Sequence, residues 1–431
     1  MHREGGLTQQ LSRGGAGSIL AKCAEVGLGL LLAVLLARLL GASGYGVYAF
    51  VFALVSLLSM PVRMGMPPLI VRETARGESE GDWESVRGVW RWANAVTLGL
   101  SLLVLAVGML ALLLDWVHDQ PLRETLFLGL WLVPLLALAA LRSASLRGLR
   151  HVLAGILPEQ VLRPALMAML LLAVMAWPGM GISPAGAMGL MLVSALVAFL
   201  SGAVLLRRYR PLAVATARPR VQGREWFRSV WPMALSQGFQ QLNRYADVIL
   251  LGVLAVAADV GVYRVAAQGA LLVSLGLTAL NMVVAPYFAR LHAEQEHSRL
   301  QKLARQTARA ALGLGIPAVA LFALYGEWLL VTLFGPEFAG AYWPLLILAG
   351  GQLANAGFGP TGLLLNMTGH ERDVTRVVAI AAGLNVALNM ALIPLFGVVG
   401  AALATSFSLA FWNVWLWVLV QARLGIRCSA V

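Results

Sequence analysis

The 431-residue chain is poor in charge and in cysteine. Only 12 % of its residues are charged, whereas 59 % are hydrophobic, a balance far from that of a soluble domain. No interval between its long apolar runs exceeds about 25 residues, which is too short for an independent soluble domain. The two cysteines, Cys23 and Cys428, make neither a disulfide framework nor a metal site.

Long apolar runs, by contrast, fill the chain. A stretch of about 20 apolar residues spans a hydrocarbon layer roughly 30 Å thick. The sequence therefore predicts an all-α polytopic membrane protein with about 12 transmembrane helices. The first run is too long for the core of a signal peptide, so we expect a retained helix. The predicted spans are 16–40, 45–71, 89–114, 126–146, 152–176, 185–206, 230–254, 262–286, 310–334, 342–367, 374–396 and 398–420.

Arginines gather in every second gap between these spans. One set of gaps holds Arg3 and Arg13, Arg147 and Arg150, and seven arginines between Arg207 and Arg228, whereas the other set is nearly free of basic residues. Because excess Lys and Arg mark the cytoplasmic side, we expect both termini to be cytoplasmic, as an even number of spans requires. A basic rim facing anionic headgroups explains the net charge of +12, so nucleic acid is not an expected partner.

The chain reads as two related halves. The expected lobes are 1–206 and 229–431, each with six helices, joined by a basic cytoplasmic linker at 207–228. An even number of spans in each half makes this a parallel repeat, and transporters of this kind place the substrate site between the repeats, near mid-membrane. Alternatively, the repeat is a duplication that only enlarged the helix bundle and has no role in transport. We favour the interpretation as a transporter. The matching segments are Gly46-Val47-Tyr48 with Gly261-Val262-Tyr263, Ala75-Arg76 with Ala289-Arg290, and Gly186-Ala187 with Gly400-Ala401.

Ordered motifs over essentially the whole chain carry a family resemblance. They are LLGASGYGVY at 39–48 and VRETAR at 71–76, then DVILLG at 247–252 and DVGVY at 259–263, and finally PLFGVVGAALAT at 394–405. The chain resembles bacterial polysaccharide-unit flippases of the multidrug/oligosaccharidyl-lipid/polysaccharide exporter superfamily.

The resemblance implies two lobes around a central cavity that opens to one side of the membrane at a time. It implies a polyprenyl-diphosphate-linked oligosaccharide as cargo, moved across the bacterial cytoplasmic (inner) membrane for O-antigen, capsule or exopolysaccharide assembly. Membrane lipid and the glycan polymerase and glycosyltransferases of the pathway are the implied partners, and no cofactor is implied. Family members often carry an acidic residue where this chain has Arg63, so a cation-coupling role at that position does not transfer.

Several charged and amide side chains fall inside the spans. A charge at a helix centre costs about 2.5–3.5 kcal/mol, so each needs water, a partner or a ligand. Arginine offers a planar fork of donors that matches phosphate oxygens, and we expect the arginines to meet the diphosphate. Arg142 is close enough to a helix end to reach the surface, so we discount it. The candidates for diphosphate and sugar binding are Arg63, Arg244, Arg163, Lys22, Gln237, Gln240 and Arg264.

The spacing of these charged residues is compatible with a purely structural role as well as with ligand binding. Oppositely charged residues on one helix face can neutralise each other, as in the pairs Lys22–Glu25, Glu159–Arg163 and Arg244–Asp247. Arg63 has no acidic residue on its own helix and is the expected free cation, unless it pairs with Glu25.

A polar stripe runs down the seventh span through Gln237, Gln240, Arg244 and Asp247. It lines water or packs in a dry helix contact, and we favour water. Asn385 and Asn389 form a weaker stripe on the eleventh span. Asp247 and Glu25 are the candidates for ion coupling, although Arg244 opposes protonation of Asp247.

Three other functions stay open. A multidrug cation exporter would need an anionic cavity, whereas the charges inside these spans lean positive. A membrane-embedded glycan polymerase or ligase would need a substantial outer loop, and no phosphate-binding, zinc-type or nucleophile motif is found. A non-transporting scaffold for a glycan-assembly complex would not need arginines deep in the membrane, so these residues argue against it.

Overall fold

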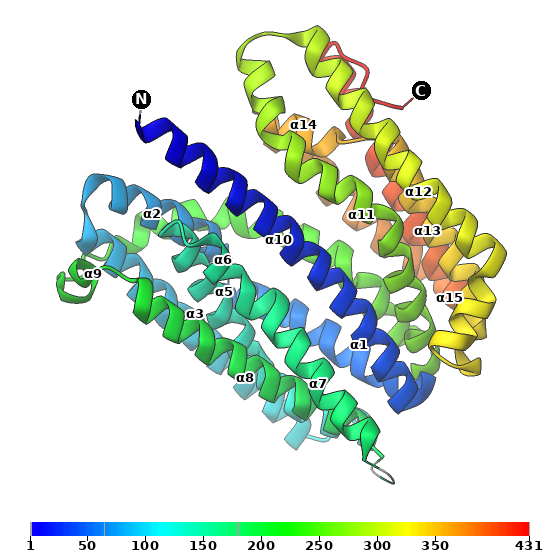
Figure 1. Ribbon diagram of the computed structural model, residues 1–431. Helices are drawn as coiled ribbons and strands as arrows, with labels where there is room; N and C mark the ends of the chain where they lie inside the picture. The colour runs from blue at the N-terminus through cyan, green and yellow to red at the C-terminus, as the bar shows by residue number, and fades with distance from the viewer. Residues whose placement is uncertain (1, 64, 178, 180, 431) are drawn as a thin grey trace. The chain divides into compact units, whose positions relative to one another are not determined.

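The computed structural model describes the backbone of residues 2–63, 65–177, 179 and 181–430, with side chains from residue 20 onward except 232 and 236. The side chains of Arg3 and Arg13 therefore lie outside the described residues. Over the described backbone the regular elements are all helical (Figure 1). They are α1 His2–Arg63, α2 Met66–Glu80, α3 Trp83–Leu113, α4 Gln120–Leu130, α5 Leu132–Gly148, α6 Val152–Leu157, η1 Pro158–Leu162, α7 Arg163–Ala176, α8 Pro184–Tyr209, α9 Leu212–Thr216, α10 Gly223–Leu254, α11 Ala257–Ala293, α12 His297–Leu333, η2 Pro336–Ala341, α13 Tyr342–Phe358, α14 Thr361–Met367 and α15 Glu371–Leu424.

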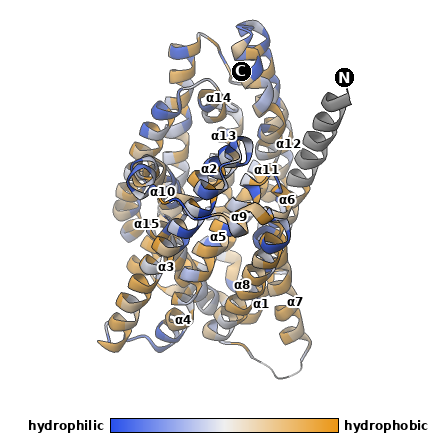
Figure 2. Ribbon diagram, turned by 90° about the vertical axis from the view of Figure 1, so that its left-hand side faces the viewer, coloured by the Kyte–Doolittle hydropathy of each residue, from blue (hydrophilic) through white to orange (hydrophobic). Residues whose placement is uncertain are grey.

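The helices have the length and composition that a bilayer requires. Among the described residues, eight helical stretches are long and apolar enough to cross a membrane. Figure 2 shows hydrophobic residues over most of α3 and α7. Leu102 and Val107 of α3 are 55 % and 60 % exposed, as side chains that face lipid would be. The expected all-α polytopic membrane fold is confirmed, while the count of 12 spans and the cytoplasmic termini stay predictions.

The chain forms two compact units. The first comprises Met1–Leu40 and Phe50–Gln241. Its core joins α2, α3, α5 and the first turns of α10, and the ring centroids of Trp92 and Trp226 lie 5.5 Å apart in it. The buried side chains of this core are Met66, Leu69, Ile70, Val89, Ala93, Leu141, Ala144, Trp226 and Val230.

The second unit comprises Gly41–Ala49 and Leu242–Val431. In it α11, α12 and α13 pack on one another around Leu277, Ala311 and Ala356. The units differ from the lobes 1–206 and 229–431 expected from the sequence. Because Trp226 and Val230 anchor the start of α10 in the first core, the division falls inside this continuous helix. The segment 41–49 joins the second unit although it belongs to the N-terminal repeat.

Glycines break several of the long helices. Gly41 in α1 and Gly397 in α15 have φ of 65° and 55°, values in the left-handed region. The single span expected at 45–71 is wrong, because α1 ends at Arg63 and α2 begins at Met66, after Gly65 with φ 68°. A Cβ at Gly65 would lie 2.6 Å from the backbone nitrogen of Ala234, so the break lets α10 approach closely.

The basic segment 207–228 is not one loop. It contains the end of α8, the short helix α9 and the start of α10. Its middle is tied to the beginning of α3, because the Arg220 amide donates to the carbonyl of Glu84 over 3.1 Å. The Arg220 guanidinium also forms an ion pair with Asp82. These contacts hold the segment against the first unit.

Candidate functional site

In the first unit, three of the charges singled out in the sequence come together. Arg63, at the end of α1, donates from Nε to the carbonyl of Ser59 and from Nη2 to its hydroxyl, both over 3.2 Å. The carboxylate of Glu159 interacts electrostatically with Arg163 and with Arg63. The expectation that Arg63 is a free cation is therefore wrong, because Ser59 and Glu159 both approach it. Glu25, the other partner considered for it, is paired within α1.

Glu159 lies in η1, a π-helical stretch between α6 and α7. Such wider turns are rare and are frequent at functional sites. Nε of Arg163 lies 3.9 Å from Oε2 of Glu159, at the outer limit of an ion pair, and both side chains are about one-fifth exposed. The carboxylate therefore keeps capacity for another donor, so the Glu159–Arg163 pair is not a closed structural contact.

Lys22 and Glu25 pair closely on α1. Nζ of Lys22 donates to Oε2 of Glu25 over 2.9 Å, and the two side chains are 32 % and 34 % exposed. This geometry agrees with the interpretation that Lys22 and Glu25, three residues apart on one helix, neutralise each other.

The polar stripe of α10 splits into two environments. Gln237 is half-buried, Gln240 and Arg244 are exposed, and Asp247 is 5 % exposed. Within the described part of the chain, no carboxylate comes within ion-pair distance of Arg244. The anticipated Arg244–Asp247 pair does not form, because Asp247 points into the second unit while Arg244 points outward.

Asp247 lies in a buried polar cluster built by α10, α11 and α15. Its Oδ2 accepts from the hydroxyl of Tyr263 over 2.6 Å and from that of Thr405 over 2.9 Å. The two hydroxyl oxygens are 3.2 Å apart. Two short hydrogen bonds to one oxygen hold the carboxylate in place.

Two asparagines of α15 complete this cluster. Nδ2 of Asn385 donates to the Thr405 hydroxyl over 3.5 Å, and Nδ2 of Asn389 donates to the backbone carbonyl of Asn385 over 2.9 Å. Three buried oxygens of this cluster have no hydrogen-bond partner among the described residues: Oδ1 of Asp247, of Asn385 and of Asn389. Buried acceptors without a donor are costly, and carboxylate and amide oxygens are what a hard cation binds.

Sequence reasoning missed part of this cluster. Tyr263 ends the repeated Gly-Val-Tyr segment, and Thr405 ends the motif PLFGVVGAALAT, but the sequence predicted no function for either residue. Their register on two other helices brings them to Asp247. Arg264, the neighbour of Tyr263, is half-buried and interacts with the hydroxyl of Tyr45 and, electrostatically, with Tyr263.

Solved structures show the same fold. An inward-facing multidrug resistance MATE family transporter of the MOP superfamily aligns with a TM-score of 0.77 at 16 % identity, over 93 % of this chain and 94 % of that chain. The lipid II flippase MurJ in an inward closed conformation aligns with a TM-score of 0.74 at 14 % identity, over 93 % and 87 %. At these identities the likeness concerns the fold.

Sequence comparisons place the chain in a family. The "Probable low-salt glycan biosynthesis flippase Agl15" of Haloferax volcanii is 24 % identical over 408 residues, which are 93 % of this chain and 81 % of that protein. The MatE family model matches residues 232–391. The polysaccharide biosynthesis protein family model matches residues 11–292, well over half of the chain. The chain therefore belongs to the polysaccharide biosynthesis protein family.

Proposed function

We propose that this protein is a transporter, not an enzyme, which moves a polyprenyl-diphosphate-linked oligosaccharide from the inner to the outer leaflet of the bacterial cytoplasmic membrane by alternating access. The family supports this proposal, as does the similarity to a relative named as a glycan biosynthesis flippase. The product would be O-antigen, capsule or exopolysaccharide, made with a glycan polymerase and glycosyltransferases as partners.

The observation that carries the proposal is a surplus of guanidinium groups over carboxylates: Arg63 ends α1, Arg163 begins α7 and Arg244 lies inside α10. Arg63 and Arg163 share one carboxylate, that of Glu159, and Arg244 is exposed without a carboxylate partner among the described residues. Such a surplus suits the two or so negative charges of a diphosphate. It does not suit the organic cations of a multidrug exporter.

The amides of α10 would serve the sugar part of the cargo. Gln237 and Gln240 precede Arg244 on the same helix at steps that keep them on one face. Amide groups both donate and accept hydrogen bonds, as sugar hydroxyls require. The polyprenyl chain would stay in lipid.

The cluster at Asp247 would couple transport to a cation. Three unpaired buried oxygens, one of which belongs to the Asp247 carboxylate, suit a single positive charge, either an alkali ion or a proton. Glu25 is a weaker candidate, because Lys22 already neutralises it at 2.9 Å.

A transport assay with a matched variant tests the function. Proteoliposomes carrying a fluorescent polyprenyl-diphosphate oligosaccharide report its movement through protection from an impermeant quencher. Arg244→Ala removes charge-assisted hydrogen bonds of about 1.5–3 kcal/mol, so we expect transport to fall roughly 10- to 100-fold. Arg228→Ala, an exposed arginine near the start of α10, is the control and should leave transport unchanged. Unchanged transport by Arg244→Ala would remove this arginine from the cargo path. Uptake of organic cations by the wild type would favour the multidrug alternative.

A further inference from the structure

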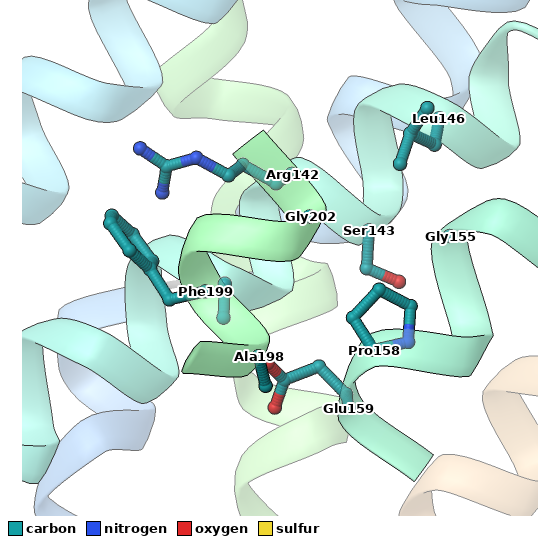
Figure 3. A pocket seen from close by; sticks show the side chains of 10 residues that line it. Arg142, Ser143, Leu146, Gly155, Pro158, Glu159, Ala198, Phe199 and Gly202 are labelled. Atoms are coloured by element: carbon teal, nitrogen blue, oxygen red, sulfur yellow. The ribbon is translucent and has the colours of Figure 1, made fainter. Parts of the chain in front are cut away.

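Arginines near the expected cytoplasmic ends of the helices differ in what they contact. Arg142 of α5 does not extend to the surface as the sequence suggested, because its guanidinium carbon lies 3.7 Å from the centroid of the Phe199 ring. Figure 3 shows both side chains lining a recess between α5, the α6–η1 region and α8. This recess is mostly apolar and has no room for a ligand larger than a water molecule, so the contact is structural. Arg305 and Arg309 of α12, in the second unit, have a different environment.

Residues 426–430 follow the end of α15 as an extended segment, the strap. The helix stops at Gly425, whose φ of 67° lies in the left-handed region. Beyond it the burial alternates, since Ile426 and Cys428 are 3 % and 0 % exposed whereas the side chain of Arg427 is exposed. An alternation with period two is that of an extended chain with one face against the protein. The strap therefore packs on the second unit.

One face of α12 holds the strap by its backbone. The side-chain oxygen of Gln301 accepts from the Arg427 amide over 3.1 Å, and Nε of Arg305 donates to the Arg427 carbonyl over 3.3 Å. Nε of Arg309 donates to the carbonyl of Ala430 over 3.1 Å. The three α12 residues follow one another at steps of four, so they lie on one side of the helix.

The other side of the strap closes a break in the neighbouring helix. Between α13 and α14 lies Gly359, whose φ is 76°. The Thr361 amide, which in a continuous helix would donate to the Gly357 carbonyl, donates to the carbonyl of Gly359 instead. The Ala430 amide takes its place and donates to the Gly357 carbonyl over 3.0 Å. Carbonyls at a helix end need donors from elsewhere, and here the strap supplies one.

The acceptors of Arg305 and Arg309 are weak ones for a guanidinium. Both side chains donate to neutral backbone carbonyls, and among the described residues neither has a carboxylate within ion-pair distance. The neighbouring Arg299, by contrast, is paired with Glu296 at 3.3 Å. A hydrogen bond to an anionic oxygen is roughly twice as strong as one to a neutral acceptor. An anion that reaches this face of α12 would therefore displace the strap.

The depth of these two arginines is that of lipid headgroups. The predicted span 310–334 begins directly after Arg309, and Arg305 lies one turn earlier, about 6 Å along the axis. The headgroup region on each side of the hydrocarbon layer is roughly 5–8 Å thick. Ile316, two turns after Arg309 and on the same face, is 53 % exposed, as a side chain against acyl chains would be.

We propose that the phosphate of an anionic membrane lipid exchanges with the strap at Arg305 and Arg309. In the lipid-bound state the two guanidiniums, one turn apart, hold the phosphodiester, and the strap backbone leaves α12. Lys302 on α12 and Arg427 on the strap are exposed and add positive charge, so they favour a headgroup of net negative charge over a zwitterionic one. Release of the strap removes the donor from Gly357 and frees the α13–α14 break to bend. This exchange is independent of the proposed cargo.

Alkylation of Cys428 reports the exchange directly, because the strap buries this thiol. A Cys23→Ala protein is placed in nanodiscs of phosphatidylcholine, with or without phosphatidylglycerol, and the rate of N-ethylmaleimide addition is measured by mass spectrometry. We expect phosphatidylglycerol to raise this rate about tenfold, the effect of replacing a neutral hydrogen bond by a charge-assisted one. Hydrogen exchange at the α13–α14 break should rise in parallel.

Matched variants locate the site. The double variant Arg305→Gln/Arg309→Gln should be alkylated quickly in phosphatidylcholine already and show no further response to phosphatidylglycerol. Arg299→Gln is the control, because this exposed arginine is paired with Glu296, and it should respond like the parent protein. If the double variant fails to fold, Arg309→Gln alone decides the matter, and its response should fall from about tenfold to about threefold.

Other outcomes would overturn the proposal. Equal alkylation with and without phosphatidylglycerol would show that the strap does not exchange with lipid, and an intact response in the double variant would place the lipid elsewhere. Acceleration by millimolar inorganic phosphate in phosphatidylcholine nanodiscs would make free phosphate the ligand. Faster alkylation without a rise in hydrogen exchange at the break would refute the link between the strap and the α13–α14 break.

Discussion

Gly46 and Gly261, equivalent positions of the repeat, touch across the helices that carry them. Both lie in the second unit, Gly46 on the segment 41–49 and Gly261 on α11. A Cβ on Gly46 would stand 1.7 Å from the carbonyl oxygen of Ala257, and one on Gly261 would stand 2.2 Å from that of Ala42. The two backbones therefore meet at a distance that only glycine permits.

Substitution of Gly46 by alanine should destabilise the protein. Since the new methyl group would clash with backbone, which cannot rotate away, the cost should be at least the ~1–3 kcal/mol of overpacking. Thermal unfolding in detergent measures it. Gly383→Ala is the control, because its Cβ meets nothing within 4 Å and alanine favours a helix. A Gly46→Ala protein as stable as Gly383→Ala would contradict the close contact.

Removal of Glu337 should loosen the kink in α1. Oε2 of Glu337 accepts from the backbone amide of Ala42 over 2.8 Å, directly after the break at Gly41, and so caps the helix that starts there. Loss of a capping group costs about 0.5–2 kcal/mol. We expect Glu337→Ala to lower the midpoint of thermal unfolding accordingly. Glu327→Ala, an exposed acidic residue of α12, should not change the midpoint.

Replacement of Asp247 by asparagine should uncouple transport from its cation. The neutral amide keeps the shape but loses the charge that balances a bound ion. A sodium titration of the unfolding temperature should show stabilisation of the wild type and none for Asp247→Asn. Asp259→Asn, in the first turn of α11, serves as the control. Loss of pH dependence of transport with no response to sodium would identify a proton instead, and full coupling in Asp247→Asn would exclude this carboxylate.

The Cys428 thiol should resist alkylation in the folded protein. It is fully buried after the end of α15, and burial raises its pKa from 9.0 to about 11. Because the folded pKa is the higher one, this thiol stabilises the fold fully below about pH 9 and loses that contribution as the pH rises towards about 11. With N-ethylmaleimide at pH 8 we expect one labelled cysteine, the exposed Cys23, and two after denaturation. Labelling of Cys428→Ala should be identical in the folded state.

The sequence alone determined the fold class. Apolar runs of bilayer length can satisfy their backbone groups only as helices, so the helical membrane architecture followed from composition and length. The close contact of Gly46 with Gly261, which lie at matching positions of the repeated Gly-Val-Tyr segments, was not predicted from the sequence. The resemblance to polysaccharide flippases is confirmed by the family match.

Only the tertiary structure decided which side chains meet. Helical spacing predicted the Lys22–Glu25 contact because both partners lie on one helix. It could not predict that Asp247 turns from Arg244 towards Tyr263 and Thr405, that Arg63 approaches Glu159, or that Arg142 rests on Phe199. Those partners come from helices far apart in the chain, and the packing angles that bring them together are set by the bundle as a whole rather than by local sequence.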